Sequence, residues 1–206
     1  MEVLNSIKTQ LGNTIELIGN KSKNNILIVG VVHGDEPQGK YLIDKYIEKS
    51  TCNILSSTNN GHKENTKKNF LFIPCLNPDG MQENKRTNAN NDETSNYFGG
   101  KYPASEIETQ FLIDTIEKYK PNLIITLHAP YKVVNYDGPA QEIAKIISDI
   151  IKYPVEENIG YPTPGSFGTW AGIEKNIPTI TLELDEKIPV TELLQPVHKI
   201  FDILKI

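Results

Sequence analysis

A continuous apolar run at residues 25–32 constrains the fold more than any other feature of the sequence. The run reads Asn-Ile-Leu-Ile-Val-Gly-Val-Val and is rich in β-branched side chains. A strand with one face in water alternates apolar and polar residues, so an unbroken run is typical of a strand buried on both faces, as in a parallel sheet. The sequence predicts three further strands, at residues 69–75, 123–127 and 178–184.

Segments with the apolar spacing of helices alternate with these strands. They lie at residues 37–49, 107–119, 141–151 and 193–204. Strands that alternate with helices predict an α/β fold. We expect a single domain over residues 1–206, with a mixed, mostly parallel twisted sheet that is flanked by helices on both faces. The polar segments 54–68 and 77–104 are predicted to be loops, and the second is long enough to suggest a functional role.

Composition excludes several classes of function. Of the 206 residues, 38% are hydrophobic, which supplies a substantial core. The net charge of −5 disfavours nucleic acid and anionic membranes as partners. The two cysteines form no CxxC motif, and the first residues lack the charged start and apolar region of a signal peptide. No apolar stretch approaches the length of a membrane helix, so we expect a cytoplasmic protein without a membrane partner. Its oligomeric state is not predicted.

Four titratable residues follow or end predicted strands. His33 and Glu36 follow the first strand, His128 follows the third, and Glu183 lies near the end of the fourth. The carboxyl ends of parallel strands meet at one edge of a sheet, where ligands gather. Two imidazoles and one carboxylate suit zinc with a fourth position open for water. Taken singly, Glu36 also fits an acid at a helix start and His128 a half-buried core histidine.

Glu183 lies within Thr-Ile-Thr-Leu-Glu-Leu. Alternation along a strand places Leu182 and Leu184 on one face and Glu183 on the other. A carboxylate in such a run is costly unless it has a partner. Water activated by a metal is one such partner, and Glu183 would then act as the general base. A carboxylate on the solvated face of an edge strand is the other interpretation.

Taken together, the motifs resemble those of the zinc carboxypeptidases over residues 25–190. In chain order they are His33-x-x-Glu36, Asn77-Pro-Asp-Gly80, Arg86-Thr-Asn-Ala-Asn90, His128, Gly160-Tyr-Pro-Thr-Pro-Gly-Ser166 with Trp170, and Thr181-Leu-Glu-Leu184. Within that family the chain is most similar to the murein peptide amidases. These are small bacterial enzymes that cut the bond between γ-D-glutamate and meso-diaminopimelate in cell-wall peptides, and the resemblance implies a role in cell-wall recycling.

The resemblance implies a role for each matching residue of the metal centre. His33, Glu36 and His128 would hold one Zn²⁺ per chain. Glu183 would take the proton from metal-activated water and pass it to the leaving amine. Arg86 would steady the developing oxyanion, since a fixed positive group there favours the tetrahedral state. Without the motif, Arg86 fits an ordinary surface arginine.

The remaining implied roles concern the substrate. Tyr161 would close over the substrate as a lid residue. Gly168 would line the side-chain pocket and leave room for diaminopimelate. Family members carry an Asn-Arg pair that grips the substrate carboxylate, whereas residues 93–98 read Glu-Thr-Ser-Asn-Tyr-Phe. Ser95 and Asn96 stand where that pair is expected, so either another cation binds the carboxylate or the substrate does not end in one there.

The sequence therefore predicts a zinc-dependent amide hydrolase that acts on a small murein peptide. Two alternatives stay open. One is an N-acyl amino-acid deacylase of the aspartoacylase or succinylglutamate desuccinylase type, which shares the same metal motif. The other is a zinc- or peptide-binding module that has lost its activity, although a pure binder has no need of a base such as Glu183.

Overall fold

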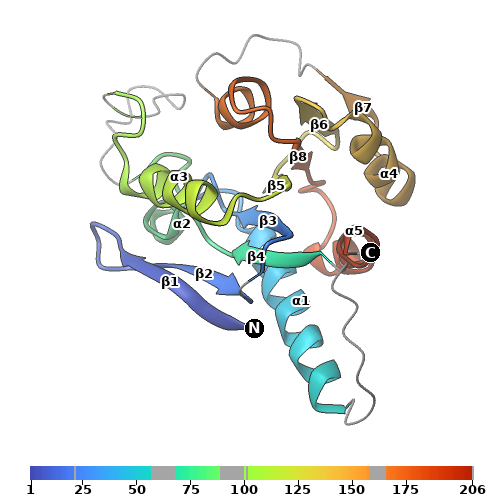
Figure 1. Cartoon of the computed structure of the whole chain (residues 1–206), viewed down its shortest axis with the longest axis horizontal. Helices are drawn as coiled ribbons and strands as arrows, with labels where there is room; N and C mark the ends of the chain where they lie inside the picture. The colour runs from blue at the N-terminus through green and yellow to red at the C-terminus, as the bar shows by residue number, and fades with distance from the viewer. Residues whose placement is uncertain (21, 57–67, 89–99, 101, 158–165, 206) are drawn as a thin grey trace.

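A computed structural model describes residues 1–20, 22–56, 68–88, 100, 102–157 and 166–205 of the chain. Within these residues eight strands form one sheet in the order β1-β2-β4-β3-β5-β8-β6-β7 (Figure 1). The strands are β1 (Glu2–Lys8), β2 (Thr14–Gly19), β3 (Asn25–Gly30), β4 (Asn69–Ile73), β5 (Leu123–His128), β6 (Val134–Asp137), β7 (Val155–Glu156) and β8 (Thr179–Glu183).

The centre of the sheet is parallel and its two sides are antiparallel. Strands β4, β3, β5 and β8 run parallel, and β6 also runs parallel to β7. Strands β1, β2 and β4 pair antiparallel, as do β6 and β8. The prediction of a mixed, mostly parallel sheet is confirmed. All six residues of β3 are buried, which explains the continuous apolar run in its sequence.

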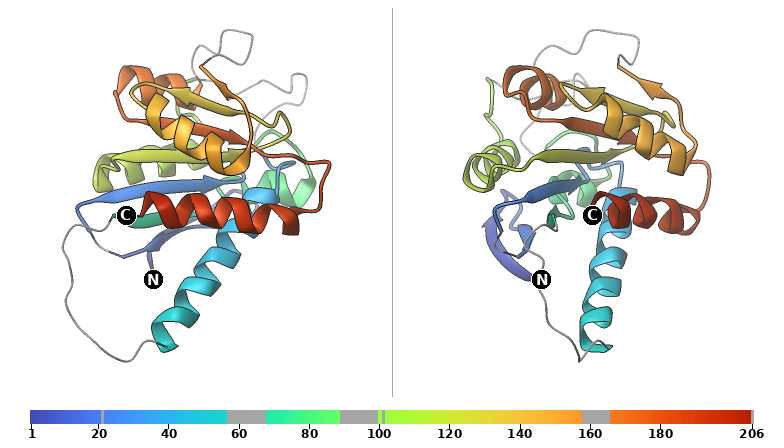
Figure 2. Two further views of the ribbon diagram at one scale, coloured as in Figure 1. Left: turned by 90° about the vertical axis from the view of Figure 1, so that its right-hand side faces the viewer. Right: turned by 45° about the vertical axis from the view of Figure 1, so that its right-hand side comes forward.

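Helices cover both faces of the sheet, as predicted (Figure 2). Among the described residues they are α1 (Gln38–Ser56), α2 (Pro78–Glu83), α3 (Ile107–Tyr119), α4 (Gln141–Ile151) and α5 (Leu194–Leu204), with a π-helix η1 (Thr169–Glu174) and a 3₁₀ turn η2 (Val190–Leu193). Helices α1, α4 and α5 pack into one apolar cluster on one face. Helix α3 and η1 pack into a second cluster on the other face. None of the described helices is both long enough and apolar enough to span a membrane.

The boundaries of several elements differ from the predictions. Helices 107–119 and 141–151 are confirmed at both ends. Helix α1 continues to Ser56, so the predicted loop over 54–68 begins too early. Helix α2 lies inside the segment 77–104 that was predicted to be a loop. Strand β3 ends at Gly30 rather than at residue 32, because the next residue has a positive φ that an extended strand cannot accommodate.

Candidate metal centre

The turn between β3 and α1 carries the first two candidate ligands. Val31 at its start has a φ of 51°, a conformation that β-branched residues rarely adopt. Its carbonyl oxygen accepts a hydrogen bond of 2.8 Å from the backbone N–H of Asn77, which holds the turn in place. A second backbone bond of 3.2 Å, from the N–H of Glu36 to the carbonyl of His33, closes the turn. The side chains of His33 and Glu36 therefore lie at the carboxyl edge of the parallel strands.

The structure brings three candidate ligands together. His33 Nδ1 lies 2.9 Å from Glu36 Oε1, and His128 Nδ1 lies 3.0 Å from Glu36 Oε2. The two Nδ1 atoms are 3.1 Å apart. Among the described residues this is the one group of three or more His, Cys, Asp or Glu side chains whose donor atoms lie within 4.8 Å of one another. The predicted cluster of two histidines and one glutamate is thus present, although 95 residues separate His33 from His128.

The spacing of these donor atoms fits a tetrahedral metal ion. Zn–N bonds are about 2.0–2.1 Å long, so donors around tetrahedral zinc lie about 3.3 Å from one another. The observed separations of 2.9, 3.0 and 3.1 Å are close to that value. If both Nδ1 atoms carry a hydrogen and donate to Glu36, neither can accept from the other, so their approach at 3.1 Å is an unfavourable donor–donor contact. A cation among the three groups removes this conflict, since each nitrogen then offers a lone pair.

Electrostatics at the cluster favour the protonation states that bind metals. Glu36 is 6% exposed, and burial by itself opposes its ionisation. Hydrogen bonds with His128 and His33 outweigh burial and hold the pKa of Glu36 well below its usual range. Burial lowers the pKa of His33 and so favours its neutral form. A carboxylate and neutral imidazoles are the forms that coordinate divalent ions.

Glu183 lies directly beside the cluster. It ends β8, and its Cα pairs with that of His128 at the end of β5. Its side chain is buried, and the backbone N–H of Tyr131 approaches Glu183 Oε2 at 3.5 Å. Burial raises the pKa of Glu183, and the charge of Glu36 acts in the same direction. A carboxylate with a raised pKa takes up and releases protons closer to neutral pH, as a general base must.

Arg86 reaches the same cluster from another segment. Its Nη1 donates a hydrogen bond of 2.8 Å to Glu36 Oε1. Its backbone carbonyl accepts from the N–H of Gly34 at 3.3 Å, and Asn77 Nδ2 donates to the carbonyl of Thr87 at 3.1 Å. The segment that bears Arg86 is therefore fixed against both the turn and the start of α2. The side chain remains about one-third exposed and can meet a ligand.

Comparison with known proteins finds relatives that are named as peptide amidases. No protein-family model matches the chain. Murein peptide amidase A of Escherichia coli K12 is 26% identical over 188 residues, which span 79% of this chain and 72% of the relative. The chain is a homologue of the murein peptide amidases.

Solved structures show that the fold is that of the metallocarboxypeptidases. The crystal structure of murein-tripeptide amidase from E. coli O157 matches with a TM-score of 0.75 at 20% identity, over 97% of this chain and 90% of that one. Carboxypeptidase A from Helicoverpa armigera matches with a TM-score of 0.71 at 13% identity, over 97% of this chain and 66% of that one. These likenesses confirm the predicted zinc carboxypeptidase-like fold.

Of the four residues predicted to contact the substrate, the structure describes only one. Tyr161, Ser95 and Asn96 lie outside the described residues, so their roles stay predictions. Gly168 is described and lies immediately before η1. A Cβ added to Gly168 would lie 2.2 Å from Asp137 Oδ2, so η1 approaches β6 very closely at this point.

Sequence reasoning missed a row of polar side chains that continues from Glu183 across the sheet. The row comprises Thr181, Thr126, Asn135 and Asp137 on strands β8, β5 and β6. In the sequence, this row is indicated by polar residues that alternate with apolar ones. Val-Asn-Tyr-Asp at 134–137 and Thr-Ile-Thr-Leu-Glu at 179–183 both place polar residues at every second position.

Proposed function

We propose that this chain is a zinc-dependent amide hydrolase that cleaves γ-D-glutamyl-meso-diaminopimelate in murein peptides. One observation carries the proposal: His33, Glu36 and His128 converge at 2.9 to 3.1 Å, with the buried carboxylate of Glu183 at the end of the neighbouring strand. Relatives named murein peptide amidase support the substrate class. Two free cysteines, Cys52 and Cys75, are compatible with the further proposal of a cytoplasmic recycling role.

Three residues would hold the metal ion in this proposal. His33 and His128 would each give a ring nitrogen and Glu36 a carboxylate oxygen. When bound by these residues, zinc would supply Lewis-acid chemistry, since such an ion polarises a carbonyl oxygen and lowers the pKa of water. The backbone N–H of Ala129 lies 3.3 Å from Glu36 Oε2 and helps to orient that carboxylate. Such supporting contacts matter because they fix the ligand before the metal arrives.

Glu183 and Arg86 carry the remaining steps. Glu183 accepts a proton from the attacking water and later donates it to the leaving amine, which its raised pKa permits. Arg86 donates hydrogen bonds to the oxygen on which negative charge develops. In the structure Arg86 binds Glu36 at 2.8 Å, so this step requires its guanidinium to share or leave that contact. Tyr161 is proposed to close over the substrate, and Ser95 and Asn96 to lie at its carboxylate end.

One experiment tests the chemistry and the substrate together. Zinc-loaded protein is incubated with L-Ala-γ-D-Glu-meso-diaminopimelate, and released diaminopimelate is measured by mass spectrometry. We expect release by the wild type and none above background by Glu183→Gln, which retains wild-type zinc content by elemental analysis. Release by both proteins would exclude Glu183 as the base. Absence of release, together with hydrolysis of acetyl- or succinyl-amino acids, would instead indicate an N-acyl amino-acid deacylase.

A second variant tests the metal ligands separately. His128→Ala removes one of the two nitrogens, so zinc content after dialysis should fall well below one ion per chain. His198→Ala removes a histidine of α5 that contacts none of the three ligands and serves as the control. Equal zinc content in wild type and His128→Ala would remove His128 from the site.

A further inference from the structure

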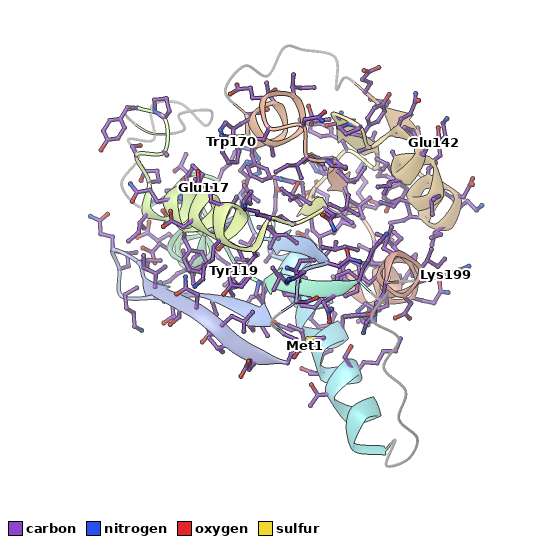
Figure 3. All side chains as sticks on the ribbon, viewed as in Figure 1. Met1, Glu117, Tyr119, Glu142, Trp170 and Lys199 are labelled. Atoms are coloured by element: carbon purple, nitrogen blue, oxygen red, sulfur yellow. The ribbon has the colours of Figure 1, made fainter. Side chains whose placement is uncertain are left out.

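The Asn-Pro-Asp-Gly motif at residues 77–80 has no role in the proposed function. Asn77 follows β4 and is the N-cap of α2, and it is completely buried. Leu76 before it packs in the same apolar cluster as α3, where Tyr119 is labelled in Figure 3. The labelled Lys199 marks α5, on the other face of the sheet. A buried amide must satisfy its donors and its acceptor within the protein, so its partners show what it holds in place.

The side-chain amide of Asn77 joins α2 to the segment that bears Arg86. Its Oδ1 accepts a hydrogen bond of 2.8 Å from the backbone N–H of Gly80, which is the ordinary contact of an N-cap. Its Nδ2 donates to the carbonyl oxygens of Arg86, at 3.4 Å, and of Thr87, at 3.1 Å. A cap needs only the oxygen, and Asp or Ser would supply it equally well. The nitrogen therefore serves the Arg86 segment rather than the helix.

The backbone of Asn77 holds the turn that carries two candidate metal ligands. Its N–H donates to the carbonyl of Val31 at 2.8 Å. In the same turn, the N–H of Gly34 donates to the carbonyl of Arg86 at 3.3 Å. Hydrogen bonds thus link the turn, the start of α2 and the Arg86 segment in a closed ring. This ring sets where the Arg86 backbone lies relative to Glu36.

Two glycines let these three segments approach closely. A Cβ added to Gly34 would lie 2.1 Å from the carbonyl carbon of Gly80. A Cβ added to Gly80 would lie 2.5 Å from Asn77 Nδ2 and 2.6 Å from the carbonyl oxygen of Thr87. Both glycines therefore allow backbone to pack directly on backbone, with the Asn77 amide at the centre of the contact. Such close packing leaves the Arg86 backbone little freedom to move.

The placement of this backbone matters because Arg86 makes a contact that the proposed reaction must loosen. Arg86 Nη1 donates to Glu36 Oε1 at 2.8 Å, and its side chain is about one-third exposed. In the proposed function the guanidinium shares or leaves this contact to meet the developing oxyanion. Its reach is then set by the backbone anchors at Asn77 and Gly34. A donor to an oxyanion must be fixed before the reaction, and a displacement of about 1 Å can cost about 10²-fold in rate.

We propose that Asn77 is a positioning residue, whose Nδ2 holds the Arg86 segment so that the guanidinium meets the oxyanion. This inference rests on the proposed function, in which Arg86 donates to that oxygen. Within the described residues, Asn77 makes no hydrogen bond to the three candidate ligands or to Glu183, so its effect passes through Arg86. Because the oxyanion forms only in the transition state, loss of the amide nitrogen should lower kcat and change KM little.

The test replaces Asn77 by residues that keep the cap. Asn77→Ser retains an oxygen for the N–H of Gly80 but loses both Nδ2 donors, and Asn77→Asp does the same at the original size. For L-Ala-γ-D-Glu-meso-diaminopimelate and zinc-loaded protein, we expect either variant to lower kcat about 10- to 100-fold at unchanged zinc content. The matched control is Phe201→Ala, which loses stability from the opposite face and should keep the wild-type kcat at a temperature where it is folded.

A double-mutant cycle separates positioning from a general loss of structure. Arg86→Ala alone should lower kcat about 10²- to 10³-fold, as removal of an oxyanion donor does. In that background, Asn77→Ser should change kcat by less than about twofold, because the guanidinium that it positions is gone. A merely structural role would lower kcat by the same factor with and without Arg86.

The outcomes separate this inference from the proposed function. Equal effects of Asn77→Ser in the two backgrounds would show that Asn77 does not act through Arg86, although the hydrolase assignment would stand. Wild-type kcat in both Asn77 variants, or loss of their zinc, would also overturn the inference. Failure of both variants to fold would assign Asn77 to the fold and overturn it too. If the zinc-loaded wild type does not cleave the tripeptide, the proposed function itself fails and the inference fails with it.

Discussion

The two faces of the sheet differ in how far apolar packing extends. The face under α1, α4 and α5 is apolar over β4, β3, β5, β8 and β6, and aromatic rings of Phe70, Phe72 and Phe201 pack there around Tyr46. The opposite face is apolar over β2, β4 and β3 but becomes polar over β5, β8 and β6. The comparison indicates that one face stabilises the fold, whereas the other carries polar side chains in place of apolar ones next to the candidate metal centre.

The largest expected effect is the loss of turnover on substitution of Glu183, which lies on the polar face of the sheet. Glu183→Gln should lower kcat for the murein tripeptide by about 10²- to 10⁴-fold, the usual contribution of a general base. The free energy of unfolding of the metal-free protein should stay equal or rise, because burial disfavours the charged carboxylate and raises its pKa. Urea unfolding and steady-state kinetics measure the two quantities. A marked loss of stability would mean that Glu183 also serves the fold.

Phe201→Ala makes the opposite change on the apolar face. Phe201 is fully buried, so its truncation should lower the free energy of unfolding by about 3–5 kcal/mol. Zinc affinity of the folded variant, measured by competition with a chromophoric chelator, should equal that of the wild type. Ile203→Ala, at a partly exposed position of the same helix, should change stability much less. A large change in zinc affinity for Phe201→Ala would show that the two faces are coupled.

The fold could be predicted where burial leaves a pattern in the sequence. The central strands are buried on both faces and read as apolar runs, and the amphipathic helices 107–119 and 141–151 show their period clearly. Strand β1 lies at the edge of the sheet with most of its residues exposed, so it carries no such pattern. Helix α2 has only six residues, and its signal is the Asn-Pro start at 77–78, where Asn77 accepts from the N–H of Gly80.

The candidate site could be predicted only in part, for a similar reason. His33, Glu36 and His128 follow recognisable strands, and topology alone brings strand ends together. The polar row to Asp137 depends on the register between β6 and β8, which a single sequence does not specify. The contact between Arg86 and Glu36 likewise depends on how the segment after α2 packs against the turn.

Asp79 of α2 sharpens the comparison, because it is a buried acid whose contacts stabilise the fold rather than form the candidate metal centre. It is fully buried and accepts hydrogen bonds from Thr9 Oγ1, from the N–H of Leu11 at 3.0 Å and from Asn13 Nδ2 at 2.8 Å. These bonds attach the β1–β2 hairpin to α2. Asp79→Ala should lower the free energy of unfolding by about 2–3 kcal/mol, since it leaves buried donors without acceptors. Zinc content should not change. Full stability by urea unfolding would show that apolar contacts alone hold the hairpin.

The smallest expected effect concerns His198, which lies on the apolar side in α5. Its Nε2 hydrogen-bonds the carbonyl of Leu42 at 2.9 Å, and burial lowers its pKa. The unfolded chain therefore takes up a proton at higher pH than the folded one, so the wild type loses stability as pH falls from about 6.5, the ordinary value for histidine. Two charged groups face His198: Lys49 lowers the pKa of His198 further, and Asp202 raises it.

His198→Gln keeps a donor for Leu42 but cannot take up the proton. The stability difference between variant and wild type should therefore grow in favour of the variant as the pH is lowered from about 7.5 to about 5.5. Urea unfolding at a series of pH values measures this, and subtraction removes the contributions of the other histidines, which both proteins share. Addition of zinc should shift both curves equally, because His198 hydrogen-bonds Leu42 of α1 and is not one of the three candidate ligands. If zinc changes the difference between the curves, protonation on the apolar face is coupled to the site, and the division between the faces is not complete.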